Sequence, residues 1–158
     1  MFVIREAKPA DAGSLRAIYL NLLRNTFTNF PAEAVDRYAA DWTAELIETR
    51  IASGNYLLLG AYEAAWTATG LLFGAPPESG VGTVIWLGVA AEARGRGIGG
   101  ELMRECFAAY RRRGCHKVKV YAENEAAKKF YLKLGMDAEG FHPRHWFGLD
   151  FWSLGIQI

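Results

Sequence analysis

The chain has 158 residues, which is the length of one ordinary domain. Hydrophobic residues make up 51% of it and charged residues 22%, a balance that excludes an intrinsically disordered chain. The formal net charge of +1 argues against general electrostatic capture by nucleic acid or by an anionic membrane. We therefore expect a single globular domain over residues 1–158, with no nucleic-acid partner and no membrane partner.

The N-terminus and the cysteines bear on the cellular compartment. The N-terminal residues include an early acidic side chain and no uninterrupted apolar core, so they do not resemble a secretory signal. No segment approaches the roughly 20 apolar residues that span a bilayer. Cys106 and Cys115 lack metal-ligand spacing and are too few for a disulfide framework. We expect a cytoplasmic protein without a metal site.

Apolar patterns predict a strand and helices in the first third of the chain. Residues 2–7 alternate apolar and polar side chains, as a strand does, and 9–11 offer a helix start. The apolar face of that helix holds Leu15, Ile18, Leu22 and Leu23. The segment 32–52 repeats the helical pattern, and Gly54 is its expected end.

Strands are predicted next. Residues 55–63 and 65–74 are two apolar runs that we expect to meet at a tight turn. Residues 76–82 are predicted as a loop. The β-branched and apolar run at 83–90 indicates a strand covered on both faces.

The second half alternates helices and strands. A helix of about four turns is predicted to follow the glycine-arginine run at 93–100 and to end near 111–114, and 116–122 alternate as a strand does. Residues 124–135 are predicted as a shorter helix closed by a glycine, and the aromatic tail as two strands around the turn at 142–145. This order indicates a mixed α/β sheet with helices on both faces.

The segment ARGRGIGG, residues 93–100, combines glycines with two arginines at a predicted helix start. Main-chain N–H groups at such a start attract an anion by roughly 0.3–1 kcal/mol, and up to about 2 kcal/mol when partly buried. Arg94 and Arg96 would each add charge-assisted hydrogen bonds of about 1.5–3 kcal/mol. Glycine lets phosphate oxygens approach the backbone. The pattern favours a diphosphate ligand.

Two other interpretations of this segment stay open on the residues alone. Gly95, Gly97 and Gly100 also satisfy the dinucleotide-binding pattern G-x-G-x-x-G, although too little chain follows to complete that fold. An ordinary strand-to-helix turn with solvated arginines is the structural alternative, but four glycines are a costly choice for it.

A second segment, NEAAKKFYLKLGM at 124–136, follows ARGRGIGG along the chain. With these two segments, the chain resembles the GCN5-related N-acetyltransferase superfamily. The superfamily signature of Arg or Gln, two residues, Gly, one residue, and Gly or Ala falls on Arg94, Gly97 and Gly99. A second coenzyme segment, NEAAKKFYLKLGM, matches at Asn124, Ala127, Phe130, Tyr131, Gly135 and Met136. The resemblance implies a central twisted, mostly antiparallel sheet of six to seven strands with helices on both faces.

The resemblance further implies acetyl-coenzyme A as co-substrate and no metal. Members bind the pyrophosphate on the glycine-arginine turn and the pantetheine arm along the preceding strand, where Gly88 would let the strand splay or bulge and free one N–H for the thioester oxygen. The coenzyme-binding residues it implies are Leu87, Gly88, Val89, Arg94, Gly95, Arg96, Gly97, Ile98, Gly99, Gly100, Asn124, Ala127, Lys128 and Phe130. Asn124 is equally a good helix N-cap, and Lys128 equally a solvated side chain.

The implied chemistry is direct acetyl transfer to the amine of a small molecule. Tyr131 matches the general acid that protonates the departing sulfur. No carboxylate lies in 83–90, where members often carry the general base, so the base stays open. The alternatives are a water chain or one of Glu33, Asp36, Asp41, His142 and His145.

The acceptor side is predicted from aromatic residues. The resemblance brings the early helices and the last strand pair to the acceptor, with Phe27, Phe30, Tyr38, Trp42, Trp146 and Phe147. An apolar or aromatic acceptor follows, with Arg144 as a candidate for binding a carboxylate. Edge strands of this fold commonly pair into homodimers. The rival hypotheses are a non-catalytic acyl-coenzyme A sensor of the same fold and a nucleotide-binding oxidoreductase.

Overall fold

A computed structural model describes all 158 residues. Its centre is a seven-stranded sheet in the order β1-β2-β3-β4-β5-β7-β6, in which only β4 and β5 run parallel. The strands are β1 (Val3–Glu6), β2 (Leu57–Tyr62), β3 (Ala68–Gly74), β4 (Val81–Val89), β5 (Lys117–Ala122), β6 (Asp137–His142) and β7 (Phe151–Gln157). The mostly antiparallel sheet that the resemblance predicted is confirmed.

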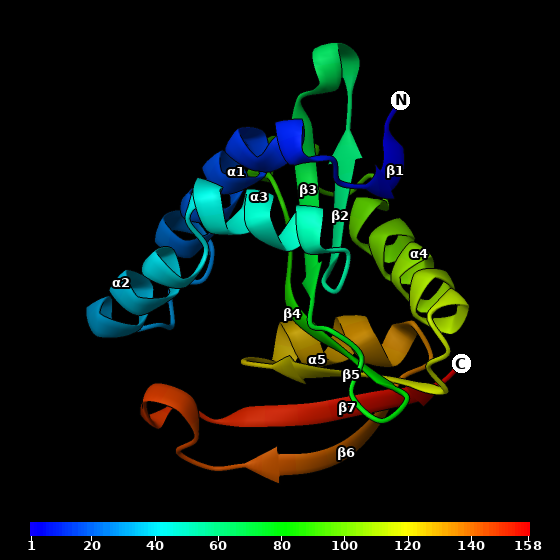
Figure 1. The fold of residues 1–158 in the computed structure, drawn as a ribbon. Coiled ribbons are helices and arrows are strands. Elements are labelled where there is room, and N and C mark those ends of the chain that lie inside the picture. The colour runs from blue at the N-terminus through cyan, green and yellow to red at the C-terminus, as the bar shows by residue number, and fades with distance from the viewer.

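Helices cover both faces of this sheet, as expected (Figure 1). They are α1 (Ala12–Asn25), α2 (Ala32–Asp41), α3 (Ala44–Ser53), α4 (Ile98–Arg112) and α5 (Glu125–Lys133), with short 3-10 turns η1 (Pro9–Asp11), η2 (Ala64–Trp66), η3 (Ala91–Ala93) and η4 (Trp146–Gly148). On one face α4 packs on β1–β4 and α5 on β5–β7, while α1 packs on β3 and β4 from the opposite face. The sheet therefore separates two apolar cores. None of the helices combines the length and the apolar composition that crossing a bilayer requires.

The helical segment predicted at 32–52 is interrupted. Helix α2 ends at Asp41, and α3 begins after Thr43, whose hydroxyl oxygen accepts a hydrogen bond from the Leu46 N–H at 3.2 Å. Between them, Trp42 leaves helical geometry (φ −133°, ψ 54°) and stacks on Phe73 with 4.6 Å between ring centres. A threonine N-cap and a buried aromatic ring thus divide into two helices the segment that periodicity alone predicts as one. The predicted end at Gly54 is confirmed by its left-handed φ of 71°.

Strand β4 differs from the prediction in two ways. It begins at Val81, inside the predicted loop, because Val81 and the next residues pair with β5. The strand also carries a β-bulge: Phe73 pairs with Trp86 and Gly74 with Val84, so Ile85 has no opposite residue. The Ile85 side chain is 40% exposed, so the expectation of a strand covered on both faces is wrong at this point.

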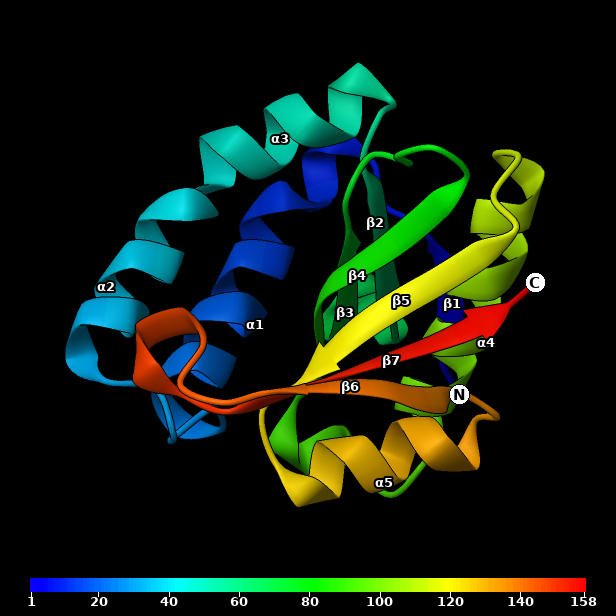
Figure 2. The ribbon, with the colours of Figure 1, turned by 90° about the horizontal axis from the view of Figure 1, so that it is seen from below.

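The C-terminal half follows the predicted order of strand, helix and two strands. Helix α5 is closed by Gly135 at φ 90°, and α4 by Gly114 at φ 82°. The connection between β6 and β7 is longer than the four-residue turn predicted, since residues 143–150 lie between the strands. Figure 2 shows this connection beside α2, which is far from it in sequence. The rings of Phe147 and Tyr38 lie 5.4 Å apart, which joins the two segments.

Candidate active site

The sheet opens between its two parallel strands. Pairing of β4 with β5 stops at Val84 and Val120, although β4 continues to Val89 (Figure 1). The Ala90 N–H donates to the Thr69 carbonyl of β3. Along an antiparallel pair, every second residue of a strand bonds to the neighbouring strand. The N–H and C=O groups of Leu87 and Val89 therefore point away from β3. Two residues of the predicted pantetheine-binding stretch therefore present main-chain polar groups to the opening.

Gly88 has a different role from the one expected. Of the two forms expected at Gly88, a splayed strand or a bulge, the bulge is wrong, because the bulge of β4 lies at Ile85. The strand has already parted from β5 after Val84. A Cβ atom at Gly88 would lie 2.3 Å from Cδ1 of Leu22 in α1. The glycine is needed because the helix packs directly on the strand here.

The glycine-arginine turn presents a row of main-chain donors. Gly95 and Gly97 have φ angles of 74° and 81°, which L-residues with side chains rarely adopt. The N–H groups of residues 95–100 have no acceptor in the protein, and after Arg94 the next N–H to donate is that of Glu101, to the Gly97 carbonyl. The row ends at the start of α4, where the helix dipole favours a negative charge. Main-chain geometry alone therefore suits this turn to bind an anion.

The two arginines of the turn have partners within the chain. Arg94 donates from Nε to the Val89 carbonyl at 3.2 Å and from Nη2 to the Thr26 hydroxyl at 2.7 Å. Arg96 forms an ion pair with Glu63. Both side chains are exposed enough to turn toward a bound anion, and their predicted contact with a diphosphate stays a prediction.

The two matched segments meet where Gly99 faces the ring of Phe130. A Cβ at Gly99 would lie 3.3 Å from its ring, whereas Gly100 has open space around it apart from the end of the Arg104 side chain. Asn124 is an N-cap: its Oδ1 accepts from Ala127 N–H at 2.8 Å. The Lys128 ammonium lies over the Trp152 ring, 5.1 Å from its centre.

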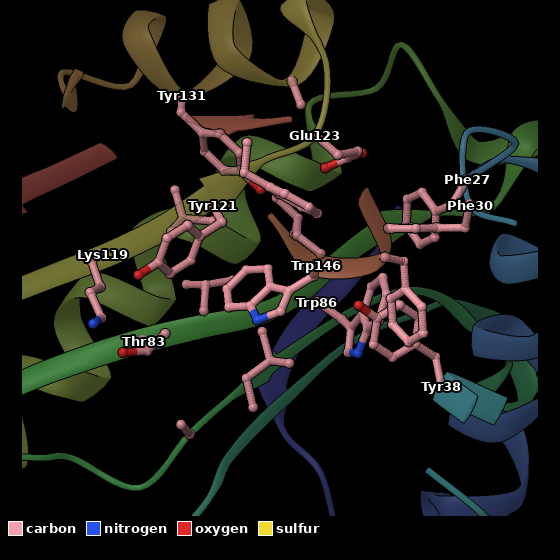
Figure 3. Close-up of a pocket in the computed structure, with 18 of the residues that line it drawn as sticks. Phe27, Phe30, Tyr38, Thr83, Trp86, Lys119, Tyr121, Glu123, Tyr131 and Trp146 are labelled. Carbon is pink, nitrogen blue, oxygen red and sulfur yellow. The ribbon is translucent and has the colours of Figure 1, made fainter. Parts of the chain in front are cut away.

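A cavity of about 810 Å³ extends from the opening in the sheet (Figure 3). Its lining comes from both faces of the sheet, and most of it is apolar. The lining residues are Phe27, Phe30, Arg37, Tyr38, Asp41, Ala75, Thr83, Val84, Ile85, Trp86, Leu87, Lys119, Val120, Tyr121, Glu123, Ala127, Phe130, Tyr131, Trp146, Phe147 and Phe151.

Aromatic residues form one end of the cavity. Trp86 is central there, with ring centres 5.4 Å from Phe27, 6.0 Å from Phe30 and 5.0 Å from Tyr38. Of the six aromatic residues expected near an acceptor, five line the cavity, and Trp42 belongs instead to the core against Phe73. Arg144, expected to bind a carboxylate, does not line the cavity.

Tyr131 reaches the cavity from α5 and is 7% exposed. Burial first, and then the charges of the neighbouring Glu123 and Cys106 groups, raise the pKa of its phenol above the ordinary value. The hydroxyl is therefore protonated throughout the neutral range.

Glu123, which follows the end of β5, is a site residue that the sequence reasoning missed. It lines the same cavity as Tyr131, and Figure 3 shows both side chains reaching into it. Burial raises the pKa of its carboxyl above the ordinary value. A signal was available, because strand alternation from Lys119 and Tyr121 continues to Glu123 and places all three on one face.

Of the five side chains proposed for the general base, only one lines the cavity. Glu33, Asp36, His142 and His145 do not line the cavity. Asp41 does, but its carboxylate accepts from Arg37 at 3.2 Å. Glu123 is thus the one carboxylate of the lining that forms no ion pair.

Comparison with known proteins agrees with this geometry. The model of the acetyltransferase (GNAT) family matches residues 16–136. A mycothiol acetyltransferase of Tsukamurella paurometabola is 32% identical over 123 residues, which are 73% of this chain and 39% of the relative. The chain thus spans about two fifths of the length of that curated relative.

Solved structures share the fold over nearly the whole chain. The PaiA N-acetyltransferase of Thermoplasma acidophilum, in complex with coenzyme A, superposes with a TM-score of 0.85 at 19% identity, covering 100% of this chain and 99% of that one. The yncA protein of Salmonella typhimurium, solved with its cofactor acetyl-CoA, superposes with a TM-score of 0.76 at 22% identity, covering 99% and 94%. From its glycine turn, its opened sheet and the match over residues 16–136, this chain belongs to the GNAT acetyltransferase family.

Proposed function

We propose that this protein is an acetyl-CoA-dependent N-acetyltransferase that moves an acetyl group directly to the amine of a small molecule. One observation carries the proposal. The unpartnered N–H groups of residues 95–100 and the cavity that holds Tyr131 and Glu123 meet at Phe130, which lies against Gly99 and also lines the cavity. An anion site and an apolar reaction chamber are thereby joined.

The residues present fit coenzyme A. The N–H row of residues 95–100 suits its pyrophosphate, with Arg94 and Arg96 able to turn toward it from Thr26 and Glu63. The outward main-chain groups of Leu87 and Val89 suit the amides of the pantetheine arm, in the manner of an added strand. Two coenzyme-bound structures among the similar folds support the assignment.

The chemistry divides between two side chains. Acetyl-CoA supplies the acetyl group as a reactive thioester. As the bond from the amine nitrogen to the acetyl carbon forms and the carbon–sulfur bond breaks, Tyr131 gives its proton to the sulfur. Glu123 takes the proton that the amine loses, and its raised pKa makes it a stronger base than an exposed glutamate. No covalent bond to the protein is required.

The acceptor is proposed to be a small molecule with an apolar or aromatic part. The cavity of about 810 Å³ has room for a small ligand, and rings such as Trp86, Tyr38 and Phe147 line it. We propose further that residues 1–158 act as one domain in the cytoplasm, where Cys106 and Cys115 stay reduced, and that the protein forms a homodimer. Both cysteines are free and buried.

The test is the release of coenzyme A thiol from acetyl-CoA across a panel of aromatic and aliphatic amines, measured with a thiol reagent. We expect turnover with at least one small aromatic amine, and the acetylated amine by mass spectrometry. Coenzyme binding by calorimetry without turnover on any acceptor would instead support the non-catalytic sensor. Affinity for nicotinamide or flavin nucleotides, with none for coenzyme A, would support the oxidoreductase.

A further inference from the structure

Lys119 faces the cavity without a counter-ion. On β5 it shares one face with Lys117 and Tyr121, because alternate residues of a strand point the same way. Lys117 donates to both oxygens of Glu139, at 2.7 and 2.8 Å, and does not line the cavity. Lys119 is half-buried, lines the cavity and belongs to none of the ion pairs of the structure. An ammonium group in such a place is suited to an anionic group of a ligand.

Thr83 adds a hydroxyl at the same end of the cavity. It is paired with Lys119 in the parallel register of β4 and β5, and Figure 3 shows both side chains at one end of the lining. The other cation of the lining, Arg37, donates to both oxygens of Asp41 and is 70% exposed, so its charge is already compensated. The uncompensated positive charge of the cavity therefore lies at Lys119.

The opposite charge lies further along the same strand face. Glu123 follows Lys119 by four residues, which corresponds to roughly 13 Å between their Cα atoms at a rise of about 3.3 Å per residue. Tyr121 lies between them, and the Trp146 ring packs on it with 4.8 Å between ring centres. A ligand that reaches both ends must cross an aromatic surface, so a planar apolar body fits between its two polar groups.

We propose that the acceptor is an aromatic amine that carries a carboxylate at the opposite end of its ring, with the carboxylate bound by Lys119 and Thr83. The proposal rests on the proposed function and names the substrate class of that site. The amine then lies at Glu123 and Tyr131 and the ring over Tyr121. An α-amino acid fits poorly, because its amine and carboxylate share one carbon and cannot reach both ends. A polyamine is disfavoured, because its second ammonium would meet Lys119.

Three probe amines that share a ring and an aminomethyl group test the subsite. They are 4-(aminomethyl)benzoate, its neutral amide, and 1,4-bis(aminomethyl)benzene, which places a cation where the acid has its carboxylate. We expect kcat/KM to fall by about tenfold from the acid to the amide, and further for the diamine, as loss of a charge-assisted hydrogen bond predicts. The difference should lie mainly in KM, since Lys119 binds the acceptor and moves no proton.

Substitutions assign the preference to the lysine. Lys119→Met keeps the length of the side chain, and we expect it to remove the preference for the acid over the amide. Lys119→Glu is expected to reverse the order of the acid and the diamine. Lys117→Met is the matched control, because it removes an ammonium from the same strand face outside the cavity, and it should keep the wild-type order.

A binding measurement separates failure of this proposal from failure of the proposed function. The affinity of 4-methylbenzoate, which has no amine, is measured by calorimetry in the presence of coenzyme A. We expect binding to the wild type and a loss of about tenfold in Lys119→Met. If no amine is acetylated, the proposed function fails while this measurement still decides the subsite. Equal rates for acid and amide in the wild type, or 4-methylbenzoate binding that Lys119→Met leaves unchanged, would overturn the proposal.

Discussion

Gly88 of β4 and Leu22 of α1 are packed so closely that a Cβ on the glycine would lie 2.3 Å from Cδ1 of the leucine. Leu22 is 1% exposed and belongs to the core between α1 and the sheet, and Gly88 is half-buried beside it. This contact holds α1 against β4. The residues on either side of Gly88, Leu87 and Val89, point their main-chain N–H and C=O groups into the opening of the sheet. Packing of the first helix and the geometry of the site are therefore linked.

Gly88→Ala should destabilise the protein by about 1–3 kcal/mol, because the added methyl overpacks a closed contact. Adding Leu22→Val removes the Cδ1 atom and should recover part of this loss, so the double variant is more stable than the sum of the single changes predicts. Urea unfolding of the four proteins measures the coupling. Gly13→Ala, in α1 with open space around it, is the control and should be neutral or stabilising. A strictly additive double variant would contradict the contact.

Gly97→Ala tests the role of the glycine turn. Its φ of 81° makes alanine unfavourable there by about 1–2 kcal/mol, and relief of that strain would rotate the N–H row out of alignment. We expect coenzyme A affinity to fall by about fivefold or more in calorimetry. Gly114→Ala is a matched control, because Gly114 has a φ of 82°, equally open surroundings and a place at the far end of α4. It should lose similar stability and keep the wild-type affinity.

Tyr131→Phe should lower kcat by about a hundredfold while leaving the dissociation constant of coenzyme A within twofold, roughly the effect of removing a general acid. Because burial raises the pKa of Tyr131, the phenol stays protonated to beyond the ordinary value of about 10, and this group causes no alkaline loss of rate below that pH. Steady-state rates from pH 6 to 10 and calorimetry measure both effects. An unchanged kcat would remove Tyr131 from the mechanism.

Glu123→Gln should lower kcat/KM by about a hundredfold and abolish the acid limb of its pH profile. That limb is expected above the ordinary glutamate pKa of about 4.3, since burial raises the pKa of Glu123. Glu125→Gln, an exposed neighbour in the first turn of α5, should leave the profile as in the wild type. A wild-type acid limb in Glu123→Gln would assign the base elsewhere.

Glu123→Gln should lower activity but not stability. A carboxyl whose pKa is raised on folding contributes its stability fully below the unfolded pKa of about 4.3 and loses it as the pH rises through the folded pKa. Glutamine has no such loss. The Glu123→Gln variant should therefore be at least as stable as the wild type at pH 7 in thermal unfolding, so a fall in its activity cannot be attributed to misfolding.

Local patterns in the sequence were enough for most elements and for the glycine turn. The glycine turn with Gly95 and Gly97, and a helix beginning beside it, follow from short-range rules, since positive φ angles and unpaired N–H groups are properties of a few adjacent residues. The same holds for the Asn124 cap and for the alternation of β5. The division of 32–52 into two helices escaped periodicity, because Trp42 is drawn into the core by Phe73, a residue of another element.

The sequence by itself thus determined the family, the order of the elements and the place of the glycine-arginine turn. Only the tertiary structure decided which charges share the cavity: it brought Glu123 and Lys119 into the lining, left Arg144 and four of the base candidates out of it, and paired Arg96 with Glu63. The physical reason is the range over which each kind of interaction acts along the chain. Turn and helix signals act over a few neighbouring residues, whereas the burial and pairing of a charge depend on side chains that the fold brings together from distant parts of the chain.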